Sequence, residues 1–156
     1  MSDPNEILKS AQRILLVDWA NRGVPRALVE AGFTVFCASP GRYSVVEVVA
    51  EPPADLDATD VFPPQEGERG YLPFQKLTDP PLNIDIVNVY RPLEEHADII
   101  ANFAVPLCAK VLWLQPTVDG TAARQLAVDQ GLALVEDVDI AVLAAQLGKQ
   151  KAIRDR

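Results

Sequence analysis

Residues 13–18 read RILLVD, a nearly continuous apolar run that ends in an acidic residue. Such a run is typical of a strand covered on both faces, as in a parallel sheet. Similar runs follow along the chain, at residues 33–38, 84–90, 110–114 and 132–135. Together these segments predict five strands of one buried sheet.

Helical stretches separate these strands. Pro25 and Pro92 fall near predicted helix starts, where a missing N–H costs little, and Gly32 and Gly131 suit helix ends. The predicted helices are residues 24–31, 93–104, 120–130 and 140–147, with Leu93, Ala97, Ile100 and Ala104 on one face of the second. This alternation predicts a Rossmann-like, doubly wound α/β fold with a five-stranded parallel sheet. We prefer the strand order 3-2-1-4-5 to the flavodoxin-like 2-1-3-4-5, although spacing alone does not separate them.

The chain of 156 residues is long enough for a single domain, which we place at 1–156. A long insertion, about residues 41–81, separates the second and third main strands. Eight of the thirteen prolines lie at positions 40–81, and residues 41–81 hold eight acidic against three basic residues. We expect one extra edge strand at residues 43–49, a loop through the rest, and a frayed tail at about 148–156.

The composition restricts the classes of partner. The net charge is −8, which disfavours binding to nucleic acid or to an anionic membrane. No apolar run approaches the roughly 20 residues of a membrane span, and the first residues do not resemble a secretory signal. The two cysteines, Cys37 and Cys108, form no C-x-x-C motif and are expected to be free, buried thiols. We therefore expect a cytoplasmic protein.

A ligand site is expected where the strand order reverses, between the first and fourth strands. Asn21, Arg22 and Gly23 precede a helix, whose free amides and positive dipole attract phosphate. The same residues are equally typical of ordinary helix capping. Asp18, at the end of the first strand, would repel a phosphate unless its carboxylate is engaged elsewhere.

Other candidates follow the second and third strands. Ser39 and Arg42 come after the second strand, and Arg91 follows the third, where it would pair either with phosphate or with a nearby glutamate. Trp19 and Tyr90 would stack on an adenine or simply pack. His96, the one histidine, is expected on the surface, and no zinc site, nucleophile–base pair or glycine-rich nucleotide motif is found. We therefore expect no catalysis.

Two segments resemble a known family. Residues 87–95 (VNVYRPLEE) look like the V-D-V-F-R-x-x-E-E segment of the small stand-alone CoA-binding proteins, relatives of the CoA-binding domain of the succinyl-CoA synthetase α subunit. Residues 109–115 (AKVLWLQ) are similar to the family's A-K-x-[LV]-W-[LM]-Q strand, and residues 36–40 (FCASP) stand where the family has x-P-V-N-P. The resemblance implies a Rossmann-like domain that binds CoA or an acyl-CoA without catalysis.

The first turn differs from the family pattern V-G-x-S, because Asp18 replaces the glycine and Ala20 the serine. Two hypotheses remain. In the first, the protein binds CoA or acyl-CoA, and the cofactor-binding residues are Trp19, Asn21, Arg22, Gly23, Ser39, Arg42, Tyr90 and Arg91. In the second, a degenerate member has lost the ligand and serves as an interaction or homo-oligomerisation module through its insertion.

Overall fold

The computed structural model describes residues 3–39 and 42–154. The strands are β1 (Arg13–Val17), β2 (Thr34–Ser39), β3 (Arg42–Val46), β4 (Val61–Phe62), β5 (Leu72–Leu77), β6 (Ile86–Val89), β7 (Val111–Leu114) and β8 (Ala133–Val135). The helices are α1 (Pro4–Ser10), α2 (Gly23–Glu30), α3 (His96–Ile99), α4 (Thr121–Asp129) and α5 (Ile140–Arg154). Two 3-10 turns, η1 (Ala58–Asp60) and η2 (Leu93–Glu95), and a π-helical segment, η3 (Ile100–Ala104), complete the elements.

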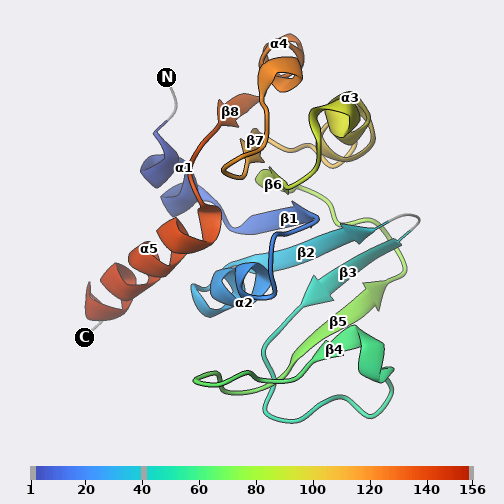
Figure 1. The fold of residues 1–156 in the computed structure, drawn as a ribbon, viewed down its shortest axis with the longest axis vertical. Coiled ribbons are helices and arrows are strands. Elements are labelled where there is room, and N and C mark those ends of the chain that lie inside the picture. The colour runs from blue at the N-terminus through green and yellow to red at the C-terminus, as the bar shows by residue number, and fades with distance from the viewer. Residues whose placement is uncertain (1–2, 40–41, 155–156) are drawn as a thin grey trace.

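The strands form one mixed sheet in the order β4-β5-β3-β2-β1-β6-β7-β8 (Figure 1). The segment β2-β1-β6-β7-β8 is parallel throughout. In terms of these strands alone the order is 2-1-3-4-5, so the preferred order 3-2-1-4-5 is wrong. The reason lies in the insertion, because β3 pairs antiparallel with β2 and occupies its outer edge. The next parallel strand, β6, therefore pairs with the free edge of β1.

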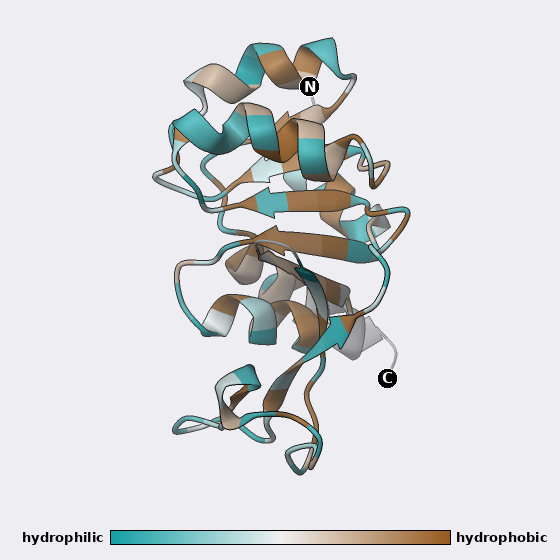
Figure 2. Cartoon of the chain, turned by 90° about the vertical axis from the view of Figure 1, so that its right-hand side faces the viewer, coloured by the Kyte–Doolittle hydropathy of each residue, from teal (hydrophilic) through white to brown (hydrophobic). Residues whose placement is uncertain are grey.

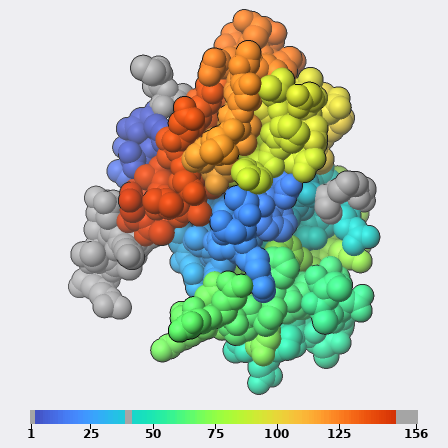
Figure 3. Space-filling view, viewed as in Figure 1, coloured from blue at the N-terminus to red at the C-terminus, as the bar shows by residue number. Residues whose placement is uncertain are grey.

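The insertion contains the extra strand expected near residues 43–49, as β3, but β4 and β5 stand where only a loop was expected. β3, β5 and β4 extend the sheet in antiparallel pairs, and a further bridge joins Val49 to Tyr71. The sheet thus has eight strands, instead of the five main strands and one extra edge strand expected. In the space-filling view these added strands and their connections make up the lower part of the molecule (Figure 3).

Helices cover both faces of the sheet. Alternate strand residues point to opposite faces, so Leu15 and Val87 pack with the α3–η3 and α4 side chains, whereas Leu16 and Ile86 pack with those of α1, α2 and α5. Hydrophobic residues are concentrated in the central strands (Figure 2). Trp113 is fully buried, as its mid-strand position predicted, and its indole N–H donates to the Val138 carbonyl.

The predicted helix at residues 93–104 is a composite of η2, α3 and η3. In η3 the Val105 N–H donates to the Ile100 carbonyl, five residues back, so this turn is wider than an α-helical one. The predicted face is only partly correct: Ile100 and Ala104 are buried, but Ala97 is exposed and its neighbour His96 takes the inner position. The expectation of a surface histidine is wrong, since His96 is buried with its Nε2 2.9 Å from the Arg91 carbonyl.

The ends of the chain also differ from expectation. Helix α1 has no counterpart among the predicted elements, although Asp3 caps it through the Asn5 N–H and Leu8 anchors it in the core. Helix α5 continues to Arg154 rather than ending near Leu147, because most residues of that tail have high helix propensity. Among the described residues, no helix has the length and apolarity to cross a membrane.

Candidate functional site

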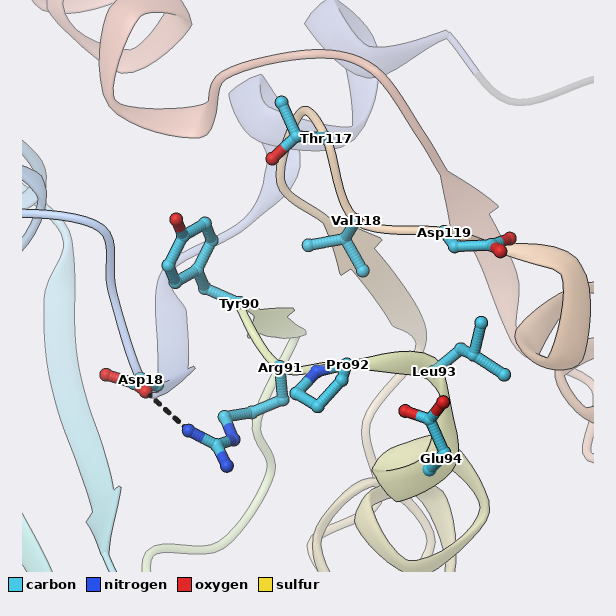
Figure 4. A pocket seen from close by; sticks show the side chains of 9 residues that line it. All are labelled: Asp18, Tyr90, Arg91, Pro92, Leu93, Glu94, Thr117, Val118 and Asp119. Carbon is cyan, nitrogen blue, oxygen red and sulfur yellow. Dashed lines mark hydrogen bonds and ion pairs between the residues drawn. The ribbon is translucent and has the colours of Figure 1, made fainter.

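Two adjoining hollows lie at the carboxyl ends of β1 and β6. The polar chamber, of about 460 Å³, is lined by Asp18, Tyr90, Arg91, Pro92, Leu93, Glu94, Thr117, Val118 and Asp119 (Figure 4). The apolar chamber, of about 440 Å³, is lined by Val17, Asp18, Trp19, Ala38, Arg91, Glu95, Ile99 and Phe103. Both chambers share Asp18 and Arg91. They lie where the direction of strand order reverses, as in other open α/β sheets, but between the first and third parallel strands rather than the first and fourth.

An ion-pair network stands between the two chambers. The Arg91 guanidinium donates through Nη1 to Asp18 Oδ2 at 3.0 Å and through Nε to both Glu95 oxygens at 3.1 Å. Hydrogen bonding to Glu95 and to Asp18 raises the pKa of Arg91, and hydrogen bonding to Arg91 lowers the pKa of Glu95. Arg91 is the one cation among the described residues that line the chambers. Its guanidinium is already paired with two carboxylates, those of Asp18 and Glu95.

Asp18 adopts the backbone conformation that glycine favours. Its φ is +66°, in the left-handed region, at the position where the resemblance places the family's glycine. Its Oδ1 accepts from the Trp19 N–H at 2.9 Å, so the carboxylate occupies one of the amides that could have met a phosphate. The turn therefore has the shape of a glycine turn but carries a carboxylate that takes up one of its amides.

Beyond Trp19, the turn contacts the insertion through Arg22 and does not reach the chambers. Asn21 Oδ1 accepts from the Gly23 N–H at 2.9 Å, which is ordinary capping chemistry. The Arg22 guanidinium donates to the Pro63 carbonyl and lies 4.4 Å from the centre of the Phe62 ring. None of Asn21, Arg22 and Gly23 lines either chamber.

The remaining predicted site residues are dispersed. Tyr90 and Arg91 line the polar chamber, and Trp19 borders the apolar one while stacking on Phe74 at 5.6 Å between ring centroids. Arg42 lines a different hollow, and the side chain of Ser39 lies outside the described residues.

Sequence reasoning missed part of the lining. Thr117, expected in the crevice because it follows β7, does line the polar chamber, and Val118 beside it was not expected. Ile99 and Phe103 come from the composite helix, and their four-residue spacing indicated a shared helix face. Asp119 precedes α4, and its Oδ1 accepts from the Thr121 N–H at 2.9 Å, which is the contact of a helix cap.

The chambers fit a CoA molecule in part. Their volumes fall within the range of about 300–1,000 Å³ that is typical of small-molecule pockets, and Val17, Ile99 and Phe103 offer an apolar wall. The phosphate groups fit poorly, because Asp18, Glu94, Glu95 and Asp119 surround the single arginine. In residues 3–39 and 42–154, no cluster of three or more His, Cys, Asp or Glu side chains could hold a metal ion.

The sequence matches a family model described as a CoA binding domain over residues 63–144, more than half of the chain. The chain belongs to this CoA-binding domain family. The family match leaves out β1, α2 and β2, the segment that carries the altered Asp18 turn.

Solved structures share the fold of this family member. Prb, a version of the PH1109 protein redesigned for binding, has 20% identity and a TM-score of 0.63 over 93% of this chain and 89% of its own. The protein cell-free ID.343 from Thermus thermophilus has 20% identity and a TM-score of 0.58 over 94% of this chain and 99% of its own. At these identities the similarity establishes a Rossmann-like α/β fold. No curated protein matches significantly.

Proposed function

We propose that this protein binds CoA or an acyl-CoA without catalysing a reaction on it. The observation that carries the proposal is the pair of adjoining chambers at the switch point of a CoA-binding domain. The apolar chamber offers Val17, Ile99 and Phe103 to an adenine or an acyl group, and Arg91 is the cation available to a phosphate.

The lining supports a binding role more than a catalytic one. The residues of the two chambers include no histidine, cysteine or lysine. The His96 ring is buried, with its Nε2 beside a backbone carbonyl. A positioned nucleophile with an adjacent base, which covalent catalysis needs, is not found among these side chains.

The alternative, a degenerate interaction module, is favoured by a different observation. Groups of the first turn and of α2 hold the insertion: Arg22 bonds to Pro63, Trp19 stacks on Phe74, and Arg26 bonds to Arg69 and Gly70. In this view Asp18 has neutralised Arg91 because no phosphate competes for it.

A matched pair of variants separates the two functions. Glycine adopts φ of +66° without strain, so Asp18→Gly keeps the turn and releases Arg91 from one carboxylate. We expect CoA affinity to rise about fivefold, since an exposed ion pair contributes up to about 1 kcal/mol. Asp137→Gly is the control, because Asp137 is exposed, has φ of +61° and carries the same charge, yet lines neither chamber.

Calorimetric titration with CoA, acetyl-CoA and NAD gives the readout. If the proposal is correct, CoA or acetyl-CoA gives saturable heat, only Asp18→Gly binds more tightly than the wild type, and NAD gives little heat. If neither wild type nor Asp18→Gly gives heat or a higher melting temperature with CoA at millimolar concentration, CoA binding is excluded and the interaction module is the remaining proposal.

The interaction module has its own test. Residues 51–57 form an exposed connection in the insertion between Val49 and η1. Replacing them with a Gly-Ser linker of equal length should abolish self-association if the insertion mediates it. Light scattering that finds the same molecular mass before and after the replacement would argue against that role.

A further inference from the structure

A third hollow, here called the edge pocket, lies where the insertion joins the parallel part of the sheet. Its volume is about 200 Å³. Cys37 of β2, Ser44 of β3 and Lys76 of β5 are direct neighbours across the three strands and line it as one row. Trp19, Phe62 and Phe74 form its aromatic side, and Arg42 lies beside the row.

The edge pocket is separate from the crevice, the name used here for the polar and apolar chambers together. Cys37 packs on the α2 face of the sheet, whereas its neighbour Ala38 packs on the α3 face with Val17 and Ile99. Because successive strand residues point to opposite faces, β2 lies between the edge pocket and the apolar chamber. Trp19 and Ala38 alone border both hollows.

Two cations line the edge pocket without carboxylate partners. Within the described residues, neither Arg42 nor Lys76 makes an ion pair, although Asp60 lines the same hollow. The balance of these charges is positive in a protein whose net charge is −8. Burial raises the pKa of the Cys37 thiol, which therefore stays neutral and adds no negative charge. The pocket differs in this respect from the crevice, where carboxylates outnumber the single arginine.

The aromatic side is suited to a planar group. Trp19 stacks on Phe74 with an interplanar angle of 15°, and Phe62 meets Phe74 edge-on at 5.0 Å between ring centroids. A ring added beside this cluster gains the offset or edge contacts that aromatic pairs prefer. The guanidinium of Arg42 and the ammonium of Lys76 are suited to a carboxylate, the first through its planar fork and the second as a point charge.

We propose that the edge pocket binds a small planar carboxylate, with the ring against Trp19 and Phe74 and the carboxylate between Arg42 and Lys76. The volume of about 200 Å³ is below that of pockets for drug-sized ligands, which restricts the occupant to about a single ring with its acid group. This site does not depend on CoA binding in the crevice.

Benzoate is the probe, and the fluorescence of the half-buried Trp19 is the reporter, since Trp113 is fully buried elsewhere. We expect saturable quenching by benzoate and at least about fivefold weaker binding of benzamide, which has the same shape without the charge. Lys76→Gln and Arg42→Gln should each weaken benzoate binding by a similar factor.

Two matched variants control for charge and for location. Arg69→Gln removes one positive charge from an exposed residue of the insertion that does not line the pocket, and Arg91→Gln removes the cation of the crevice. Both should bind benzoate as the wild type does. The proposal is overturned if benzoate fails to saturate at about 10 mM, if benzamide binds equally well, or if Arg91→Gln abolishes the signal.

Discussion

Two buried amide side chains, Asn88 and Gln115, differ in whether they have a hydrogen-bond partner. Asn88 lies on β6, in register with Leu16 and Trp113, and neither its Nδ2 nor its Oδ1 has a partner. Gln115 Oε1 accepts from the Ile140 N–H at 3.0 Å and so holds the start of α5. The same chemical group therefore lowers the stability of the fold at position 88 and raises it at position 115.

We predict opposite effects on stability from replacing these two amides. Asn88→Val should raise the free energy of unfolding by about 1 kcal/mol, because it removes an unpaired buried polar group from a strand. Gln115→Leu should lower it by about 1–2 kcal/mol, because the Ile140 N–H loses its acceptor. Urea unfolding with unchanged m-values gives both quantities. Destabilisation by Asn88→Val would instead indicate a buried water that binds Asn88.

Asp85 provides a pH-dependent contribution. Burial raises the pKa of this carboxyl, but the Arg13 and Gln12 backbone amides together with Lys110 lower it below its usual value. The Gln12 and Arg13 N–H groups donate to Asp85 Oδ2 at 2.8 and 2.9 Å. A carboxyl whose pKa is lower in the folded state stabilises the protein above its unfolded pKa, about 3.9.

We therefore predict that Asp85→Asn destabilises the protein in a pH-dependent manner. At pH 7 the loss should be about 1–2 kcal/mol. It should shrink as the pH falls below about 3.9 and through the folded pKa, because the wild-type carboxyl is then protonated as well. Unfolding curves of both proteins between neutral and acid pH measure the difference. A loss that is constant over this range would contradict the assigned role.

Arg26 attaches the insertion to helix α2. The Arg26 side chain is 5% exposed, donates to the Arg69 and Gly70 carbonyls, and lies 3.3 Å from Glu68. Arg22, one turn earlier, makes a single hydrogen bond to Pro63 and a contact with Phe62, and is half-buried. The two arginines reach neighbouring parts of the insertion from the same segment but differ in burial.

We predict that Arg26→Met lowers the free energy of unfolding by about 3 kcal/mol, because it leaves two carbonyls and a carboxylate without their buried partner. Arg22→Met, the matched control, should cost less than about 1 kcal/mol. Hydrogen exchange at the Val49 and Tyr71 amides, which pair with each other, should be faster in Arg26→Met only. Equal effects of the two substitutions would contradict this account.

Most elements were predictable from sequence because their signals are local. The main strands appear as apolar runs, and Pro92 with the following acids marks a helix start. The face of that helix was only partly predictable, because its inner position is taken by the polar His96 and not by the apolar Ala97. Sequence also could not show that residues 72–77 pair with β3, since pairing between distant segments leaves no local periodicity.

The candidate site was predictable only where it depends on strand ends. Tyr90 and Arg91 follow a strand and do line the crevice. Asn21 and Arg22 also follow a strand, yet Asn21 bonds within its own turn and Arg22 bonds to the insertion. Which of two strand ends opens to a cavity depends on the sheet order and on what covers the turn, and both are properties of the assembled fold.

The overall charge of the protein determines how its affinity for an anionic ligand changes with salt. The net charge is −8, and Asp18, Glu94, Glu95 and Asp119 surround Arg91 in the crevice. An anionic ligand such as CoA therefore approaches a negative field that salt screens.

We predict that CoA affinity rises about twofold to threefold when ionic strength is raised from about 0.01 to 0.15 M, where the Debye length falls from about 30 to 8 Å. Calorimetry at fixed pH measures the change, with neutral pantetheine as a control that should show none. A decrease of affinity with salt would mean that the positive charge of Arg91 outweighs the carboxylates around it.

The shortness of the two border strands affects how the folded protein behaves at high concentration. The sheet ends in β4, of two residues, on one side and in β8, of three residues, on the other. Long unpaired borders act as templates for intermolecular strand pairing, which leads to aggregates and amyloid. The two-residue β4 covers only Leu72 and Pro73 of β5, so the outer edge of residues 74–77 is the part of this border that can still pair with another molecule.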